Sequence, residues 1–149
     1  MQNLVELLKD HALLLAAGNS LSAIARADEP RPEAAFDALR RLARQLEQHL
    51  RAEDEFLVQD REHGRQEFAT LAAEHGERFD DLVQEWGTYL REWTEENIRC
   101  DWPSFRKATG WIVERLNEQV EAENAALYPS ALRYGIIRLL PETERAPAH

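Results

Sequence analysis

Apolar residues recur every three or four positions in four blocks of the chain, which is the pattern of helices that bury one face. The blocks run from Leu4 to about Ala27, from Pro32 to about Asp60, from Phe68 to about Ile98, and from Asp101 or Ser104 to Leu127. No stretch alternates apolar and polar residues convincingly, as a half-buried strand does. The sequence therefore predicts an all-α protein.

Prolines and polar residues separate these blocks. Pro30 and Pro32 lie between the first and second blocks, and the polar stretch 59–64 lies between the second and third. Asp101 or Ser104 can cap the fourth helix. Connections this short force neighbouring helices to run antiparallel, which predicts an up-down-up-down four-helix bundle.

The C-terminal region is expected to close the bundle. We expect Pro129 to interrupt the fourth helix and a short C-terminal helix, from Ala131 to Leu140, to pack across the bundle. Residues 141–149 are expected to form a flexible tail. The sequence thus predicts one domain, residues 1–140, followed by this tail.

Each apolar stripe is interrupted by polar or titratable residues, which are His11, His49 with Glu53, His75, and Gln119 with Glu123. The spacing of four places each of the two pairs on a single helix face. In an antiparallel bundle the three histidines and Gln119 lie about nine to eleven residues from one end, roughly 14–16 Å along the axis. The two glutamates lie one turn closer to that end. We therefore expect these side chains to meet in one buried pocket.

Such a pocket is suited to a metal ion. Burying titratable groups without partners costs several kcal/mol each. Imidazole and carboxylate are ligands for iron, manganese or zinc, and carboxylates shared between two ions hold dinuclear centres in helix bundles. A single buried histidine usually bonds a backbone carbonyl, but several such groups at one height favour a metal site. We assign no role to His63 or His149.

The same residues resemble the hemerythrin-like family, the HHE cation-binding domains. The family pattern is one His on helix one, HxxxE on helix two, His on helix three and HxxxE on helix four. His11 in KDHALLL, the segment HLRAE at 49–53, and His75 in AAEHGERF match it. The segment QVEAE matches at Glu123, whereas Gln119 replaces the histidine, and ENAALYPSALR resembles the family's usual close of helix four.

The resemblance implies a carboxylate-bridged di-iron centre. The ligands it implies are His11 and His49 for one ion, His75 for the other, and Glu53 and Glu123 as bridges. An amide oxygen is a weaker donor than imidazole for iron or zinc. Because Gln119 replaces the histidine, we expect the second metal position to bind its ion loosely or to take a harder ion such as manganese. Binding or sensing of O₂ or NO, or iron handling, are the functions that the family suggests.

Composition narrows the range of partners. The chain has 149 residues, with 28 acidic and 18 basic side chains and a net charge of -10, which argues against binding to nucleic acid or to anionic membranes. Charges interrupt every apolar stretch well before the roughly 20 residues that a membrane span needs, and the N-terminus lacks the pattern of a signal peptide. Cys100 is the single cysteine, so we expect a cytoplasmic protein without disulfides.

Two other functions stay open on the sequence. The first is a structural or interaction module whose metal site has degenerated and which acts through its acidic surface, a protein partner or self-association. The second is a di-iron oxidase or peroxidase-like enzyme, which would need an open coordination position and a proton donor. We assign no catalytic residue, because no Ser/His/Asp order, phosphate-binding glycine loop or CxxC pair supports a hydrolase, kinase or thiol-redox enzyme.

Overall fold

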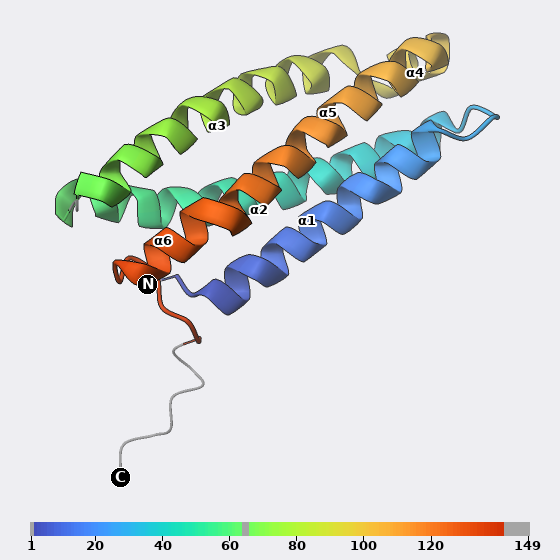
Figure 1. Cartoon of the computed structure of the whole chain (residues 1–149). Helices are drawn as coiled ribbons and strands as arrows, with labels where there is room; N and C mark the ends of the chain where they lie inside the picture. The colour runs from blue at the N-terminus through green and yellow to red at the C-terminus, as the bar shows by residue number, and fades with distance from the viewer. Residues whose placement is uncertain (1, 64–65, 142–149) are drawn as a thin grey trace.

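The computed structural model is a bundle of long helices that lie side by side (Figure 1). It describes residues 2–63 and 66–141, with the side chains of 56–63, 66 and 67 left out. The long helices are α1 (Leu4–Ala25), α2 (Pro32–His63), α3 (Gln66–Glu92) and α5 (Trp102–Ala122). The described residues contain no strand, which confirms the predicted all-α bundle.

Side-chain caps and one proline set where the helices begin. The Asn3 side chain accepts a hydrogen bond from the Glu6 N–H at 2.8 Å and caps α1. The Asp101 carboxylate accepts from the Ser104 N–H at 3.2 Å, so Asp101 rather than Ser104 caps α5. Pro32 is the first residue of α2, where its missing N–H costs no hydrogen bond.

Helix α2 continues to His63 instead of ending near Asp60. Residues 60–63 include no glycine or proline that would end the helix earlier. The polar stretch 59–64 therefore belongs largely to the helix. The side chain of His63 and all of His149 lie outside the described residues.

The prediction of one helix from Phe68 to Ile98 is wrong. Helix α3 ends at Glu92, and the short helix α4 (Glu95–Cys100) follows. The Thr94 side chain caps α4 by accepting from the Asn97 N–H at 3.2 Å, and the Asn97 side-chain amide donates to the Glu92 carbonyl at 2.6 Å. These bonds satisfy backbone groups on both sides of the break, which is why the chain turns there.

The sequence led us to expect that Pro129 interrupts the fourth helix, and this prediction is wrong. Helix α5 passes through a π-helical turn, η1 (Glu123–Leu127), directly into α6 (Tyr128–Arg133). In this wider turn the Tyr128 N–H donates to the Glu123 carbonyl, five residues earlier. The turn comes just before Pro129, which has no N–H for the next helical bond.

The prediction of a separate helix from Ala131 to Leu140 is wrong, because α6 continues the fourth helix from Tyr128 and ends at Arg133, and residues 134–140 are not helical. Gly135 has a φ of 74°, and the Ile136 N–H donates to the Ala131 carbonyl at 2.8 Å, a hydrogen-bond pattern that closes helices at glycine. The segment after it returns to the start of α1, where the Leu4 N–H donates to the Arg138 carbonyl at 2.7 Å. In Figure 1 the N-terminus accordingly lies beside α6. The predicted tail, residues 142–149, lies outside the described residues.

Two apolar clusters fill the bundle interior. The larger cluster includes Leu14, Leu42 and Ile112, and the smaller one lies around Leu7, Phe68, Leu127, Tyr128, Ala131 and Ile137. His11 lies on α1 between Leu7 of the smaller cluster and Leu14 of the larger one, so a polar layer separates the two. None of the helices in the described part of the chain is long and apolar enough to cross a membrane.

Candidate metal centre

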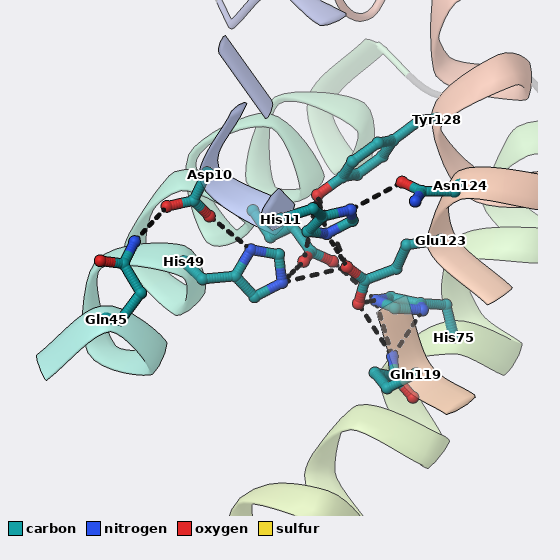
Figure 2. A network of polar contacts seen from close by, with 10 residues as sticks. Asp10, His11, Gln45, His49, His75, Gln119, Glu123, Asn124 and Tyr128 are labelled. Atoms are coloured by element: carbon teal, nitrogen blue, oxygen red, sulfur yellow. Dashed lines mark hydrogen bonds and ion pairs between the residues drawn. The ribbon is translucent and has the colours of Figure 1, made fainter. Parts of the chain in front are cut away.

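The polar layer brings together every residue that interrupted the apolar stripes. His11 comes from α1, His49 and Glu53 from α2, His75 from α3, Gln119 from α5 and Glu123 from the start of η1. Their exposed fractions are 0–2%, except for Gln119 at 8%. Figure 2 shows the labelled side chains of this network converging from their separate helices.

Two imidazoles face one side of the carboxylate pair. His11 Nε2 lies 2.7 Å from Glu123 Oε1, and His49 Nε2 lies 3.0 Å from the same oxygen. His49 Nε2 also contacts Glu53 Oε2. One ligand atom from each of these four residues lies within 4.8 Å of all the others, an arrangement able to hold a metal ion.

The other oxygen of each carboxylate faces His75 and Gln119. His75 Nε2 lies 2.8 Å from Glu53 Oε1 and 3.3 Å from Glu123 Oε2. The Gln119 amide donates to Glu123 Oε2 at 3.0 Å. Each glutamate thus presents one oxygen to the His11 side and the other to the His75 side, which is the arrangement that a pair of bridging carboxylates requires.

On the His11 side of the centre, the ring nitrogens that face away from the carboxylates have hydrogen-bond acceptors as partners. His49 Nδ1–H donates to the Asp10 carboxylate at 2.8 Å, and His11 Nδ1–H donates to the Asn124 side-chain oxygen at 2.6 Å. Gln45 donates to the second Asp10 oxygen at 3.0 Å and helps to hold it. Such acceptors fix the orientation of a metal-ligating imidazole and leave Nε2 available for the ion.

His75 has the opposite arrangement. The Gln119 amide nitrogen lies 3.0 Å from His75 Nδ1 and can only donate there. The same nitrogen lies 3.4 Å from His75 Nε2, so it sits beside the ring and not along the Nδ1 lone pair. The nearest partner of His75 Nδ1 is therefore a donor, whereas His11 and His49 have acceptors there that support a metal-ligating ring.

The electrostatics of the layer call for positive charge between the carboxylates. Burial alone would lower the pKa of His49, but its hydrogen bonds to Asp10, Glu123 and Glu53 raise it to about 12. Burial and the charge of Glu123 raise the pKa of Glu53, whereas hydrogen bonds from His11 and His49 outweigh burial and hold the pKa of Glu123 well below its usual range. Without a cation, His49 therefore keeps the proton that balances part of the negative charge of the two glutamates.

Tyr128 also belongs to the layer, although the sequence did not single it out. It is fully buried, and its phenol oxygen lies 2.9 Å from His11 Nε2 and 3.5 Å from both Glu53 Oε2 and Glu123 Oε1. Burial and the charges of Glu53 and Glu123 raise its pKa. Its spacing of five from Glu123 fits a π-helical turn rather than an α-helix, so α-helical periodicity could not find it.

Asp10 and Asn124 were missed for a different reason. Each is the sequence neighbour of a stripe residue, His11 or Glu123, and it serves an imidazole of the layer from beside the stripe. A polar residue next to a buried ligand was the available signal. Glu118 and Glu121, the acidic neighbours of Gln119, are both exposed and do not join the centre.

Comparison with protein families identifies the fold and the class of site. The family model described as hemerythrin HHE cation binding domain matches residues 3–131. The chain belongs to this family. The match confirms the resemblance seen in the sequence and, with the buried His/Glu cluster, identifies a metal-binding hemerythrin-like protein. Comparisons with curated proteins and with solved structures give no match.

Proposed function

We propose that this hemerythrin-like protein binds one iron ion firmly through His11, His49, Glu53 and Glu123, and a second ion only weakly through His75 and Gln119. The observation that carries the proposal is the pair of fully buried carboxylates. Among the described residues, none of their ion pairs involves lysine or arginine. A divalent ion would supply the positive charge that the layer now obtains by holding protons.

The chemistry of the donor atoms fits this ion. Imidazole nitrogen and carboxylate oxygen suit iron, and they also accept manganese or zinc. Donors about 2.0–2.2 Å from a first-row ion lie roughly 2.8–3.6 Å from one another at tetrahedral to octahedral angles. The separation of 3.0 Å between His49 Nε2 and Glu123 Oε1 falls in this range, and that of 2.7 Å for His11 Nε2 lies just below it.

The proposed weakness of the second position has two physical causes. Gln119 offers an amide where the family pattern has an imidazole, and as the side chain stands its amide N–H faces Glu123 Oε2. The same amide nitrogen, a donor, lies 3.0 Å from His75 Nδ1, where the other two imidazoles have an acceptor. An ion on this side would have to turn the amide around and would bind an imidazole without that support, and both lower its affinity.

We propose that a small ligand such as O₂ or NO reaches the centre from the Gln119 side. A pocket of about 70 Å³ is lined by Arg78, Leu82, Arg115, Glu118, Gln119 and Ala122. A cavity of about 10–15 Å³ already holds one water molecule, so the pocket has room for a molecule such as O₂ or NO. Ferrous iron among nitrogen and carboxylate ligands supplies a site for such ligands or for storing the metal. The residues of the chain exclude bulk water and hold the donor atoms in place.

Metal analysis of tag-free protein, combined with anaerobic reconstitution of the metal-free form with ferrous iron, tests the proposal. We expect one tightly held iron per chain, and loss of binding in His49→Ala and Glu53→Ala. Thr109→Val is the matched control, because Thr109 is buried and polar but bonds Tyr89 away from the centre. At a hundredfold excess over Kd the ion should stabilise the fold by about 2.7 kcal/mol, which raises Tm by roughly 5–11 °C for a chain of this size.

Two results would contradict the proposal. Equal iron binding in the control and in both site variants would mean that the ion lies elsewhere. A wild-type protein that takes up neither iron nor manganese nor zinc, and whose Tm does not respond to them, would favour the interaction module with a degenerate site.

A further inference from the structure

We infer that Tyr128 is an additional oxygen ligand of the metal ion held on the His11 side. This inference rests on the proposed function and extends it to a residue outside the histidine and glutamate pattern. The phenol oxygen lies among the donor atoms already described, 2.9 Å from His11 Nε2 and 3.5 Å from one oxygen of each glutamate. Figure 2 shows the phenol oxygen of Tyr128 directed into the cluster beside the His11 ring.

These distances suit a ligand of an ion that takes the place of the proton between the phenol and His11. All three separations lie within the roughly 2.8–3.6 Å expected between donors that share one ion. A phenol that served only to hold a carboxylate would lie closest to a carboxylate oxygen, at about 2.7–2.8 Å. Here the phenol oxygen lies at hydrogen-bond distance from His11 Nε2 and farther from either carboxylate, so its partner is the nitrogen that is proposed to bind the ion.

The oxygens that it approaches also define the side of the centre to which Tyr128 belongs. Glu53 Oε2 and Glu123 Oε1 are the carboxylate oxygens that face His11 and His49, and the opposite pair faces His75. The Tyr128 and His11 rings stack with centroids 4.8 Å apart and an interplanar angle of 16°. Two nearly parallel rings therefore bring their donor atoms to the same place.

The π-helical turn is the structural cause of this placement. In an α-helix, residues five apart point in clearly different directions, and Tyr128 would not share a face with Glu123. The turn Glu123–Leu127 closes with the bond from the Tyr128 N–H to the Glu123 carbonyl, which brings the two residues onto one face. Such single turns occur inside α-helices frequently at functional sites.

Ligation by Tyr128 has a spectroscopic signature that does not depend on activity. Binding to iron(III) replaces the phenol O–H bond by an O–Fe bond and releases one proton to the solvent. A phenolate–iron(III) bond gives a visible charge-transfer band and enhances ring vibrations in the resonance Raman spectrum. We expect both signals in wild-type protein that has been loaded with iron and oxidised in air.

The chain has only three tyrosines, which allows a matched set of variants. Tyr128→Phe should lose the band while still binding iron. The double variant Tyr89→Phe with Tyr134→Phe leaves Tyr128 as the sole tyrosine and should keep the band. Tyr89 is itself a buried tyrosine whose hydroxyl lies 2.6 Å from Thr109 Oγ1, so it controls for the loss of a buried hydroxyl.

The outcomes separate this inference from the proposed function. Iron-loaded wild type without a phenolate signal, a band that persists in Tyr128→Phe, or a band missing from the double variant would each overturn ligation by Tyr128 and leave the histidine–glutamate site intact. Wild type that binds no iron would overturn both proposals. If Tyr128→Phe does not fold, the double variant still decides the question.

Discussion

Removal of the Asp10 carboxylate should weaken the metal centre although Asp10 is not itself proposed as a ligand. Its two oxygens accept hydrogen bonds from His49 Nδ1 at 2.8 Å and from Gln45 at 3.0 Å. These bonds hold the His49 ring so that Nε2 faces the two glutamates. Loss of such a partner typically costs about 10–100-fold in metal affinity, or roughly 1.4–2.8 kcal/mol. We expect Asp10→Ala to raise the Kd for iron by this factor.

Asp10→Asn should have a smaller effect. An asparagine can turn its side-chain oxygen toward His49 and its amide toward Gln45, whose own amide can turn to accept. The hydrogen bond to Nδ1 then survives and only the negative charge is lost. The two Asp10 variants thus separate the positioning of the ring from the charge that supports it.

Competition with a chromophoric chelator measures the Kd of each variant, and the Tm of each metal-free protein reports any general loss of stability. Asp81→Ala is the matched control, because it removes one carboxylate from an exposed position of α3. The reasoning fails if Asp10→Ala binds iron as tightly as Asp81→Ala does. It also fails if Asp10→Asn is as weak as Asp10→Ala, because orientation would then contribute nothing beyond charge.

Two further predictions concern the second position and pH. Gln119→His should raise the iron content from one toward two per chain, because it supplies an imidazole and removes the amide nitrogen beside His75 Nδ1. Two tightly held ions in the wild type, or no gain in the variant, would contradict this. The raised pKa of His49 stabilises the metal-free fold fully below about pH 6.5, and this contribution is lost as pH rises toward about 12. Thermal melts should therefore show the metal-free Tm falling above about pH 6.5 while the gap to the metal-loaded form widens, and a constant gap would show that the ion does not replace this proton.

Helical periodicity was enough to predict the fold class and the meeting of the stripe residues in one layer. The spacing of four in His49/Glu53 and Gln119/Glu123 is a property of the regular α-helix, and both pairs lie in or directly beside α-helical segments. The height argument worked because the chain between each residue and the chosen bundle end is almost entirely helical. The break at Trp93–Thr94 did not disturb the height argument. The height of His75 is counted from the start of α3, and the break follows the other end of that helix.

Departures from the regular α-helix were not visible in the periodicity. Thr94 and Asn97 end one helix and begin another through side-chain bonds to backbone groups, which depend on local geometry rather than on hydrophobic spacing. Gly135 was a readable stop signal for α6, but the apolar run up to Leu140 obscured it. The π-helical turn had no pattern of its own, and it placed Tyr128 in the centre.

The two sides of the centre differ by more than one ligand. On the His11 side, both imidazoles donate Nδ1–H to an acceptor, Asp10 or Asn124, so both present Nε2 to the carboxylates. On the other side the atom nearest His75 Nδ1 is the Gln119 amide nitrogen, a donor, so this ring lacks the kind of acceptor that holds the other two. Replacement of one histidine by glutamine therefore weakens two potential ligands, the lost one and the one that remains. This coupling is the physical basis for the proposal that the pair of carboxylates holds a single ion tightly.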